Sequence, residues 1–223
     1  MIKKILSLSS VLVLASATFA HADVIGTTSV FQLTLDGCSG TCGTSPFGTV
    51  TLVQTATGVV TVTETLKATT PAEGFVATGA GESLDWNLTG NPVITIGFLT
   101  SGFGVTGATS ASAFGNFEYS VSCAGISCGP GASTTNPGPL SFTVTDASAD
   151  GVNVSDFIGN SGGFFFASDI IGANGNTGNV ASGPGTVDPP SVPEPTSLLL
   201  FGTGLAAAAG FARRRIASAI KSN

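Results

Sequence analysis

The middle of the chain alternates apolar and polar residues with a period of two, the pattern of a β-strand that buries one face. Three segments show the pattern most clearly: 29–35 (SVFQLTL), 48–54 (GTVTLVQ) and 59–66 (VVTVTETL). Further strands are predicted at 84–88, 93–99, 117–122, 140–145 and 164–171. Clusters of Gly, Pro, Asn and Ser separate these segments, and helical patterning is almost absent outside the two ends of the chain.

Eight or more short strands, each with one apolar face, must bury those faces against another sheet. We therefore predict an all-β fold over residues 23–180, an antiparallel β-sandwich of the jelly-roll type. The expected core includes Trp86, Phe98, Phe142 and Phe165. The Gly- and Pro-rich stretch 181–191 is predicted to be a flexible linker after the sandwich.

The first 22 residues have the layout of a secretory signal peptide. A basic start at Lys3 and Lys4 is followed by the apolar stretch 5–19. Ala20 and Ala22 then place small residues at the two positions that a signal peptidase reads. The expected mature chain begins at Asp23, and an uncleaved N-terminal anchor is the alternative.

The C-terminal region contains an apolar stretch without any charged residue, 196–212. Its length is at the lower limit for a helix that crosses a bilayer, and it lacks the polar face that a buried core helix needs. Arg213, Arg214 and Arg215 follow, and basic residues beside an apolar span stay on the cytoplasmic side. We predict a single transmembrane helix over 196–212 with a stop-transfer signal, and a cytoplasmic tail over 216–223.

A short rigid motif precedes this span. Pro193 and Pro195 hold the backbone extended around Glu194, immediately after Val192. An exposed, stiff tripeptide at the membrane face is well suited to recognition by an enzyme. A plain membrane anchor does not explain why the motif is there.

The order of proline-framed glutamate, apolar span and three arginines over 192–215 resembles the PEP-CTERM sorting signal of Gram-negative bacteria. The resemblance implies recognition by an exosortase, an integral membrane protease that cleaves at the tripeptide and passes the protein toward the cell surface. It also implies a bacterium that makes exopolysaccharide. Such a tail is sometimes labelled an ice-binding protein C-terminal domain, but no ice binding follows from the label.

The charges of the body exclude one class of partner. Lys67 is its single basic residue, because the other six of the seven Lys and Arg lie in the terminal segments. The body carries the acids Asp23, Asp36, Glu64, Glu73, Glu82, Asp85, Glu118, Asp146, Asp150, Asp156, Asp169 and Asp188. Such a surface repels phosphate backbones, so nucleic acid is not an expected partner. The neutral coat of Thr, Ser, Asn and Gly indicates solubility rather than sugar binding.

The four cysteines fall as two close pairs, Cys38 with Cys42 and Cys123 with Cys128. An even number in an exported protein favours disulfides, and three pairings are possible. We favour the two local loops, because glycines inside each segment let the chain double back. Cross-pairing would tie two distant loops together. A zinc site is disfavoured because the gaps of three and four residues do not match zinc motifs and no histidine is near.

Catalytic motifs are scarce. The single histidine, His21, is lost with the signal peptide, which excludes imidazole chemistry in the mature protein. The GxGxxG pattern at 102–107 is predicted to be a flexible turn because no helix pattern follows it. Segment 146–157 is predicted to be a solvated turn, because its acids miss the calcium-loop pattern. The acids that remain available for two-carboxylate glycoside hydrolysis are Glu64, Glu73, Glu82, Asp85 and Glu118, and their spacing selects no pair.

Together these patterns predict an exported, non-enzymatic cell-surface or extracellular-matrix protein without cofactor or metal. It is expected to be sorted and cleaved by an exosortase-type system and to associate with exopolysaccharide. The alternative is a secreted carbohydrate-active enzyme or a sugar-binding adhesin that uses loop carboxylates.

Overall fold

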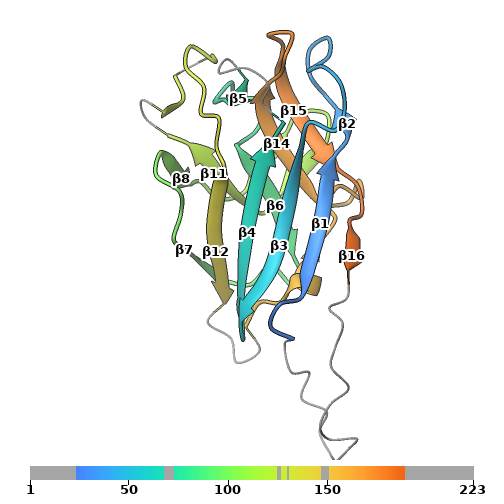
Figure 1. Ribbon diagram of the computed structural model, residues 1–223, viewed down its shortest axis with the longest axis vertical. Helices are drawn as coiled ribbons and strands as arrows, with labels where there is room; N and C mark the ends of the chain where they lie inside the picture. The colour runs from blue at the N-terminus through green and yellow to red at the C-terminus, as the bar shows by residue number, and fades with distance from the viewer. Residues whose placement is uncertain (1–23, 68–72, 125–126, 130, 147–150, 189–223) are drawn as a thin grey trace, which may run out of the picture.

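The computed structural model describes residues 24–67, 73–124, 127–129, 131–146 and 151–188. These residues form antiparallel β-sheets with one short 3₁₀ helix, η2 (Val154–Asp156). The all-β class predicted from the alternation is confirmed. Figure 1 shows long strands running along the vertical axis, with both ends of the described chain at the lower edge.

The six-stranded sheet has the order β16-β1-β3-β4-β12-β7. Its strands are β1 (Thr28–Leu33), β3 (Gly48–Ala56), β4 (Val59–Leu66), β7 (Ile94–Gly97), β12 (Leu140–Asp146) and β16 (Thr186–Asp188). Every pairing within it is antiparallel.

The eight-stranded sheet has the order β2-β15-β14-β6-β11-β8, with β13 also paired to β6 and β5 to β14. Its strands are β2 (Leu35–Asp36), β5 (Gly74–Phe75), β6 (Leu84–Leu88), β8 (Phe103–Val105), β11 (Tyr119–Cys123), β13 (Phe157–Ile158), β14 (Phe166–Ile171) and β15 (Thr177–Ser182). A separate hairpin joins β9 (Thr109–Ala111) to β10 (Gly115–Phe117).

The β3–β4 hairpin shows how the sequence pattern becomes structure. Val50 and Leu52 on β3 are fully buried, as are Val60 and Val62 on β4, while the threonines between them face away from the core. The two strands meet at a tight turn in which Gly58 adopts a φ of +68°, a conformation that favours glycine. The period-two pattern therefore gave the strands and their buried faces correctly.

One apolar core contains residues of both sheets. Trp86 of β6 and Phe142 of β12 are each 1% exposed, and their ring centroids lie 5.2 Å apart across the two sheets. These two predicted core residues are confirmed, and Phe165 is half-buried against the same cluster. Phe98 was predicted wrongly: it follows β7 with a φ of +51°, and its side chain is 93% exposed.

Several strand boundaries differ from the prediction because turns interrupt the apolar runs. The segment 29–35 divides at Thr34 into β1 and β2, which belong to different sheets. The segment 93–99 shortens to β7, since the left-handed backbone at Phe98 ends it. Residues 102–107 contain the strand β8 rather than a flexible turn, and β8 pairs with β11.

The predicted linker 181–191 is wrong over its first eight residues. β15 continues to Ser182, and Thr186–Asp188 forms β16 along the edge of β1. This pairing gives β1 a neighbour on its second side, so the edge strand is not left open there. The folded body therefore extends to Asp188, and residues 189–191 lie outside the described residues.

Candidate functional site

The predicted processing sites lie outside the described residues. These sites are Ala20, Ala22, the motif 192–195 and the three arginines 213–215. In the part of the chain that the structure describes, no helix is both long and apolar enough to span a membrane. The predicted span 196–212 falls outside that part.

The folded body shows where the two terminal segments that are predicted to be processed join it. Thr28, near the first described residue Val24, pairs with Asp188, the last described residue. The two ends of the body therefore lie side by side at one end of the molecule (Figure 1). A signal peptide and a C-terminal tail would leave the body from the same corner.

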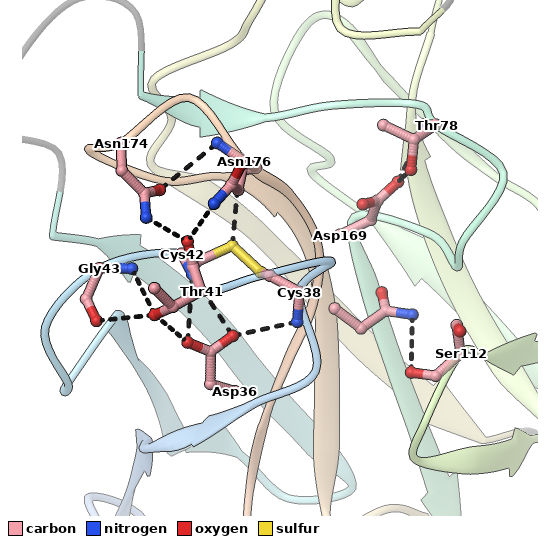
Figure 2. The surroundings of a disulfide bond; sticks show 11 residues. Asp36, Cys38, Thr41, Cys42, Gly43, Thr78, Ser112, Asp169, Asn174 and Asn176 are labelled. Carbon is pink, nitrogen blue, oxygen red and sulfur yellow. Dashed lines mark hydrogen bonds between the residues drawn. A yellow bond between two sulfur atoms is a disulfide. The ribbon is translucent and has the colours of Figure 1, made fainter.

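The first predicted disulfide, Cys38–Cys42, is present with a Cα–Cα distance of 5.6 Å. Asp36 organises the loop that it closes. Its carboxylate accepts hydrogen bonds from the Thr41 hydroxyl at 2.6 Å and from the backbone N–H groups of Cys38 and Cys42 at 3.0 and 3.1 Å (Figure 2). Desolvation alone would raise the pKa of Asp36, but these hydrogen bonds outweigh it and hold the pKa below its ordinary value.

This loop is fastened to the turn between β14 and β15. The side-chain amides of Asn174 and Asn176 both donate to the carbonyl oxygen of Thr41 (Figure 2). Gly172 lies so close to the Cys42 backbone that a Cβ atom there would overlap it. The disulfide loop is therefore a structural clasp between β2 and the β14–β15 hairpin.

The second predicted disulfide, Cys123–Cys128, also forms locally, with a Cα–Cα distance of 5.6 Å. Both cysteines are buried, and the Cys123 N–H donates to the hydroxyl of Ser83 at 2.8 Å. The local pairing that we favoured is confirmed for both loops. Among the described residues, the one group with the spacing of metal ligands is Asp36, Cys38 and Cys42, and its two sulfurs are bonded to each other.

The carboxylates considered for catalysis lie in different surroundings, and of these only Glu82 is placed beside Asp85, to which its N–H donates. Glu64 is fully buried on β4 between the sheets, whereas Asp85 is fully buried on the opposite face of β6 from the core residues Leu84 and Trp86. Glu118 is exposed. Burial raises the pKa of the Glu64 carboxyl well above its usual range; the Ser168 hydroxyl opposes this in part, and the charge of Asp85 adds to it.

One buried acid near Asp85 was not among the residues predicted for a site. Asp169 of β14 is fully buried on the outer face of the eight-stranded sheet, and it influences the pKa of Asp85. Its Oδ2 accepts hydrogen bonds from the Thr78 hydroxyl at 2.6 Å and the Thr78 N–H at 2.9 Å. Burial raises the pKa of Asp169 to about 6, in spite of the two bonds from Thr78, and Glu82 adds to the increase. The sequence signal was an acid in the mostly apolar run FFFASDII.

One acid of segment 146–157, Asp156, serves local structure. Asn153 caps η2, and its N–H donates to the Asp156 carboxylate at 2.8 Å. Asp156 thus takes part in a capping box with Asn153. Asp150 lies outside the described residues.

Comparison with protein families identifies one feature of the chain. Residues 191–215 match the PEP-CTERM protein-sorting motif. No curated protein and no solved structure gave a match to the chain. The match covers the tail and carries no information on the activity of the two-sheet body.

Proposed function

We propose that this protein is a non-enzymatic cargo of an exosortase-type system, with a jelly-roll-like β-sandwich that is carried outside the cell and released by cleavage at its C-terminal motif. One observation carries the proposal: the sorting motif at 191–215 begins three residues after Asp188, where the folded body ends. That motif marks a protein sorted by an exosortase system. We further propose that the product stays at the cell surface or in the exopolysaccharide matrix.

The short connection supports processing close to the membrane. Seven residues, 189–195, separate Asp188 from the predicted span. At about 3.3–3.6 Å per residue, they reach at most about 25 Å. Before cleavage the end of the body that carries Val24 and Asp188 would therefore face the membrane, with Glu194 next to the bilayer surface.

The cysteines support a destination outside the cytoplasm. Both pairs form disulfides, and such bonds persist in oxidising compartments. A reduced Cys38–Cys42 loop would lose the covalent closure beside Asp36, although its hydrogen bonds to Asn174 and Asn176 could still form.

The positions of the carboxylates support a non-enzymatic role. Two-carboxylate hydrolysis requires a pair of acids on either side of one sugar. Glu64 lies between the two sheets and Asp85 on the outer face of the eight-stranded sheet, and both are fully buried, so a sugar reaches both only if the body opens. No observation favours the carbohydrate-active alternative over a structural cargo.

The proposal is tested by replacing the motif in a host that has an exosortase. Alanines at Pro193, Glu194 and Pro195 should leave the full chain in the membrane fraction, whereas the unaltered protein should appear outside the cells without its tail. The matched control replaces Pro189 and Pro190 by alanine, which removes two prolines from the same segment but keeps the motif. Release of the triple variant at the normal level and size would contradict the proposal.

A further inference from the structure

A groove enters the two-sheet body at the end where both termini leave it. It lies between β1 on one side and η2 with β13 on the other, and has a volume of about 470 Å³. Its lining includes Phe31, Phe157, Phe165, Val154, Ile158 and Ser29. We call it the terminal groove. Its volume is within the range of about 300–1,000 Å³ that is typical of small-molecule sites.

The apolar wall of the terminal groove is held in place by ring packing. Phe31 stacks on Phe165 with centroids 5.3 Å apart and meets Phe166 edge-on at 4.9 Å. Phe166 also lies 6.0 Å from Phe157. Because each ring is fixed by a neighbour that belongs to the core, the apolar wall of the groove is preformed.

One polar group in the groove lacks a partner. Ser29 is 1% exposed, and its Oγ has no hydrogen-bond partner among the described residues. The neighbouring Gln54, by contrast, donates to the carbonyl oxygens of Ala56 and Val152 and accepts from the Val154 N–H. A buried hydroxyl without a partner is unfavourable, so its presence in a ligand-sized groove indicates a missing hydrogen-bonding group.

The groove also indicates the charge of its ligand. None of its lining residues is Asp, Glu, Lys, Arg or His. A charged molecule would lose its hydration there without gaining an opposite charge, which is strongly unfavourable. A neutral molecule loses little and buries its apolar surface against Phe31, Phe157 and Phe165.

We propose that the terminal groove binds a small neutral molecule with a ring-containing apolar body and one hydroxyl or carbonyl group that bonds to Ser29. The apolar body packs against the phenylalanines, and the single polar group supplies the partner that Ser29 lacks. The site belongs to the folded body alone, so the inference does not depend on the proposed sorting function.

Equilibrium dialysis of three probes against the full chain in phospholipid nanodiscs tests the proposal. The probes are 2-naphthol, its hydroxyl-free analogue 2-methylnaphthalene, and the anion 2-naphthoate. Probe taken up by the lipid is measured with the variant Ile158→Trp and subtracted. Ile158 is 38% exposed at the rim of the groove, and an indole there fills its mouth. Val93→Trp places the same ring at an 86%-exposed position before β7, on the other edge of the six-stranded sheet, and is the matched control.

We expect 2-naphthol to bind the unaltered chain and Val93→Trp equally, and Ile158→Trp not at all. Ser29→Ala should weaken 2-naphthol binding by about five- to tenfold, the value of one hydrogen bond, and leave 2-methylnaphthalene unchanged. Equal binding of 2-naphthoate, or no difference between the unaltered chain and Ile158→Trp, would overturn the proposal. Binding that appears only when the chain is ended after Asp188 would also overturn it, since residues 189–223 would then occupy the groove.

Discussion

The two faces of the eight-stranded sheet bury very different side chains. The inner face packs Trp86 and Phe166 against the six-stranded sheet. The outer face buries the carboxyl groups of Asp85 and Asp169. On that outer face, Phe114 and Phe117 of the β9–β10 region cover Ala167 and Ala181. Both faces are buried at β6 and over most of β14 and β15, yet only the inner one gains free energy from nearly every group that it buries there.

In this molecule, a buried side chain therefore does not always stabilise the fold. Removing an aromatic ring from water is favourable, whereas removing a carboxylate is unfavourable unless it is protonated or fully hydrogen-bonded. The Oδ1 atoms of Asp85 and Asp169 have no hydrogen-bond partner among the described residues. We therefore expect the inner face to determine the stability of the body and the outer face to determine how that stability depends on pH.

The largest effect is expected from Trp86→Ala. The indole is 1% exposed and packs between Tyr119 and Phe142, at centroid distances of 5.9 and 5.2 Å. Its loss should lower the free energy of unfolding by about 3–5 kcal/mol, measured by chemical denaturation. Phe98→Ala removes another aromatic ring, but one that is 93% exposed, and should cost less than about 0.5 kcal/mol. Similar losses in both variants would mean that the inner face is not the source of stability.

The second effect concerns the pH dependence that Asp169 gives to the outer face. Its pKa is about 6 in the folded body against an ordinary value of 3.8, so the folded state holds a proton that the unfolded chain releases. Stability from this group is fully present below about pH 4 and is lost as the pH rises through about 6, by about 3 kcal/mol.

Asp169→Asn should flatten this dependence, because an amide does not titrate and its oxygen can still accept the two bonds from Thr78. Denaturation between pH 4 and pH 7.5 measures the slope. Glu118→Gln, which removes an exposed carboxyl, is the control for the loss of one negative charge and should keep the slope. A stability that rises with pH over this range in the unaltered protein would contradict the assignment.

A third effect is expected from Glu64, an acid that is fully buried between the two sheets. Burial raises the pKa of its carboxyl well above the usual range, so charging it at neutral pH opposes folding. Glu64→Gln, which resembles the protonated form, should raise the free energy of unfolding by about 1–2 kcal/mol at pH 7. At pH 4 the gain should disappear. If Glu64→Gln instead lowered the free energy of unfolding equally at both pH values, the carboxyl group of Glu64 would be held by specific hydrogen bonds.

The smallest effect comes from the exposed Asp36, and its sign is opposite. Its pKa lies below the ordinary value, so the stability that it adds is present above about pH 4 and is lost as the pH falls. Because the group is exposed, Asp36→Asn should cost less than about 1 kcal/mol at pH 7. Thermal unfolding at pH 7 and pH 3 checks this. A larger loss of stability in Asp36→Asn at pH 3 than at pH 7 would have the opposite sign. It would contradict a stabilising role for the charged form of Asp36.

The inner face was more predictable from sequence than the outer one. Local alternation sufficed for Val50, Leu52 and the strand 84–88, because the apolar residues of each strand mark the side that faces the core. It failed at Phe98, where a left-handed turn outside the periodic pattern directs the ring to solvent. The disulfide pairing followed from loop closure alone, which is also a local property.

The proximity of Asp85 and Asp169 on the outer face could be predicted only from the order of the strands in the sheet. Asp85 and Asp169 become neighbours because β6 pairs with β14, with Ala167 opposite Asp85. Trp86 of β6 and its partner Phe166 of β14 are 80 residues apart in the sequence, and the composition of the two segments does not indicate that they pair. β15 was missed because its sequence, TGNVAS, resembles a turn, and β16 because it lies among Gly and Pro residues. Both strands form through tertiary pairing rather than local preference.

The central claim is that the body is built to be separated from both ends of the chain. The most direct test is the intact mass of the protein recovered from a host with a working exosortase. The predicted species begins near Asp23, ends near Pro195 and contains two disulfides. A protein that retains its residues through Asn223, with free thiols at all four cysteines, would contradict the account.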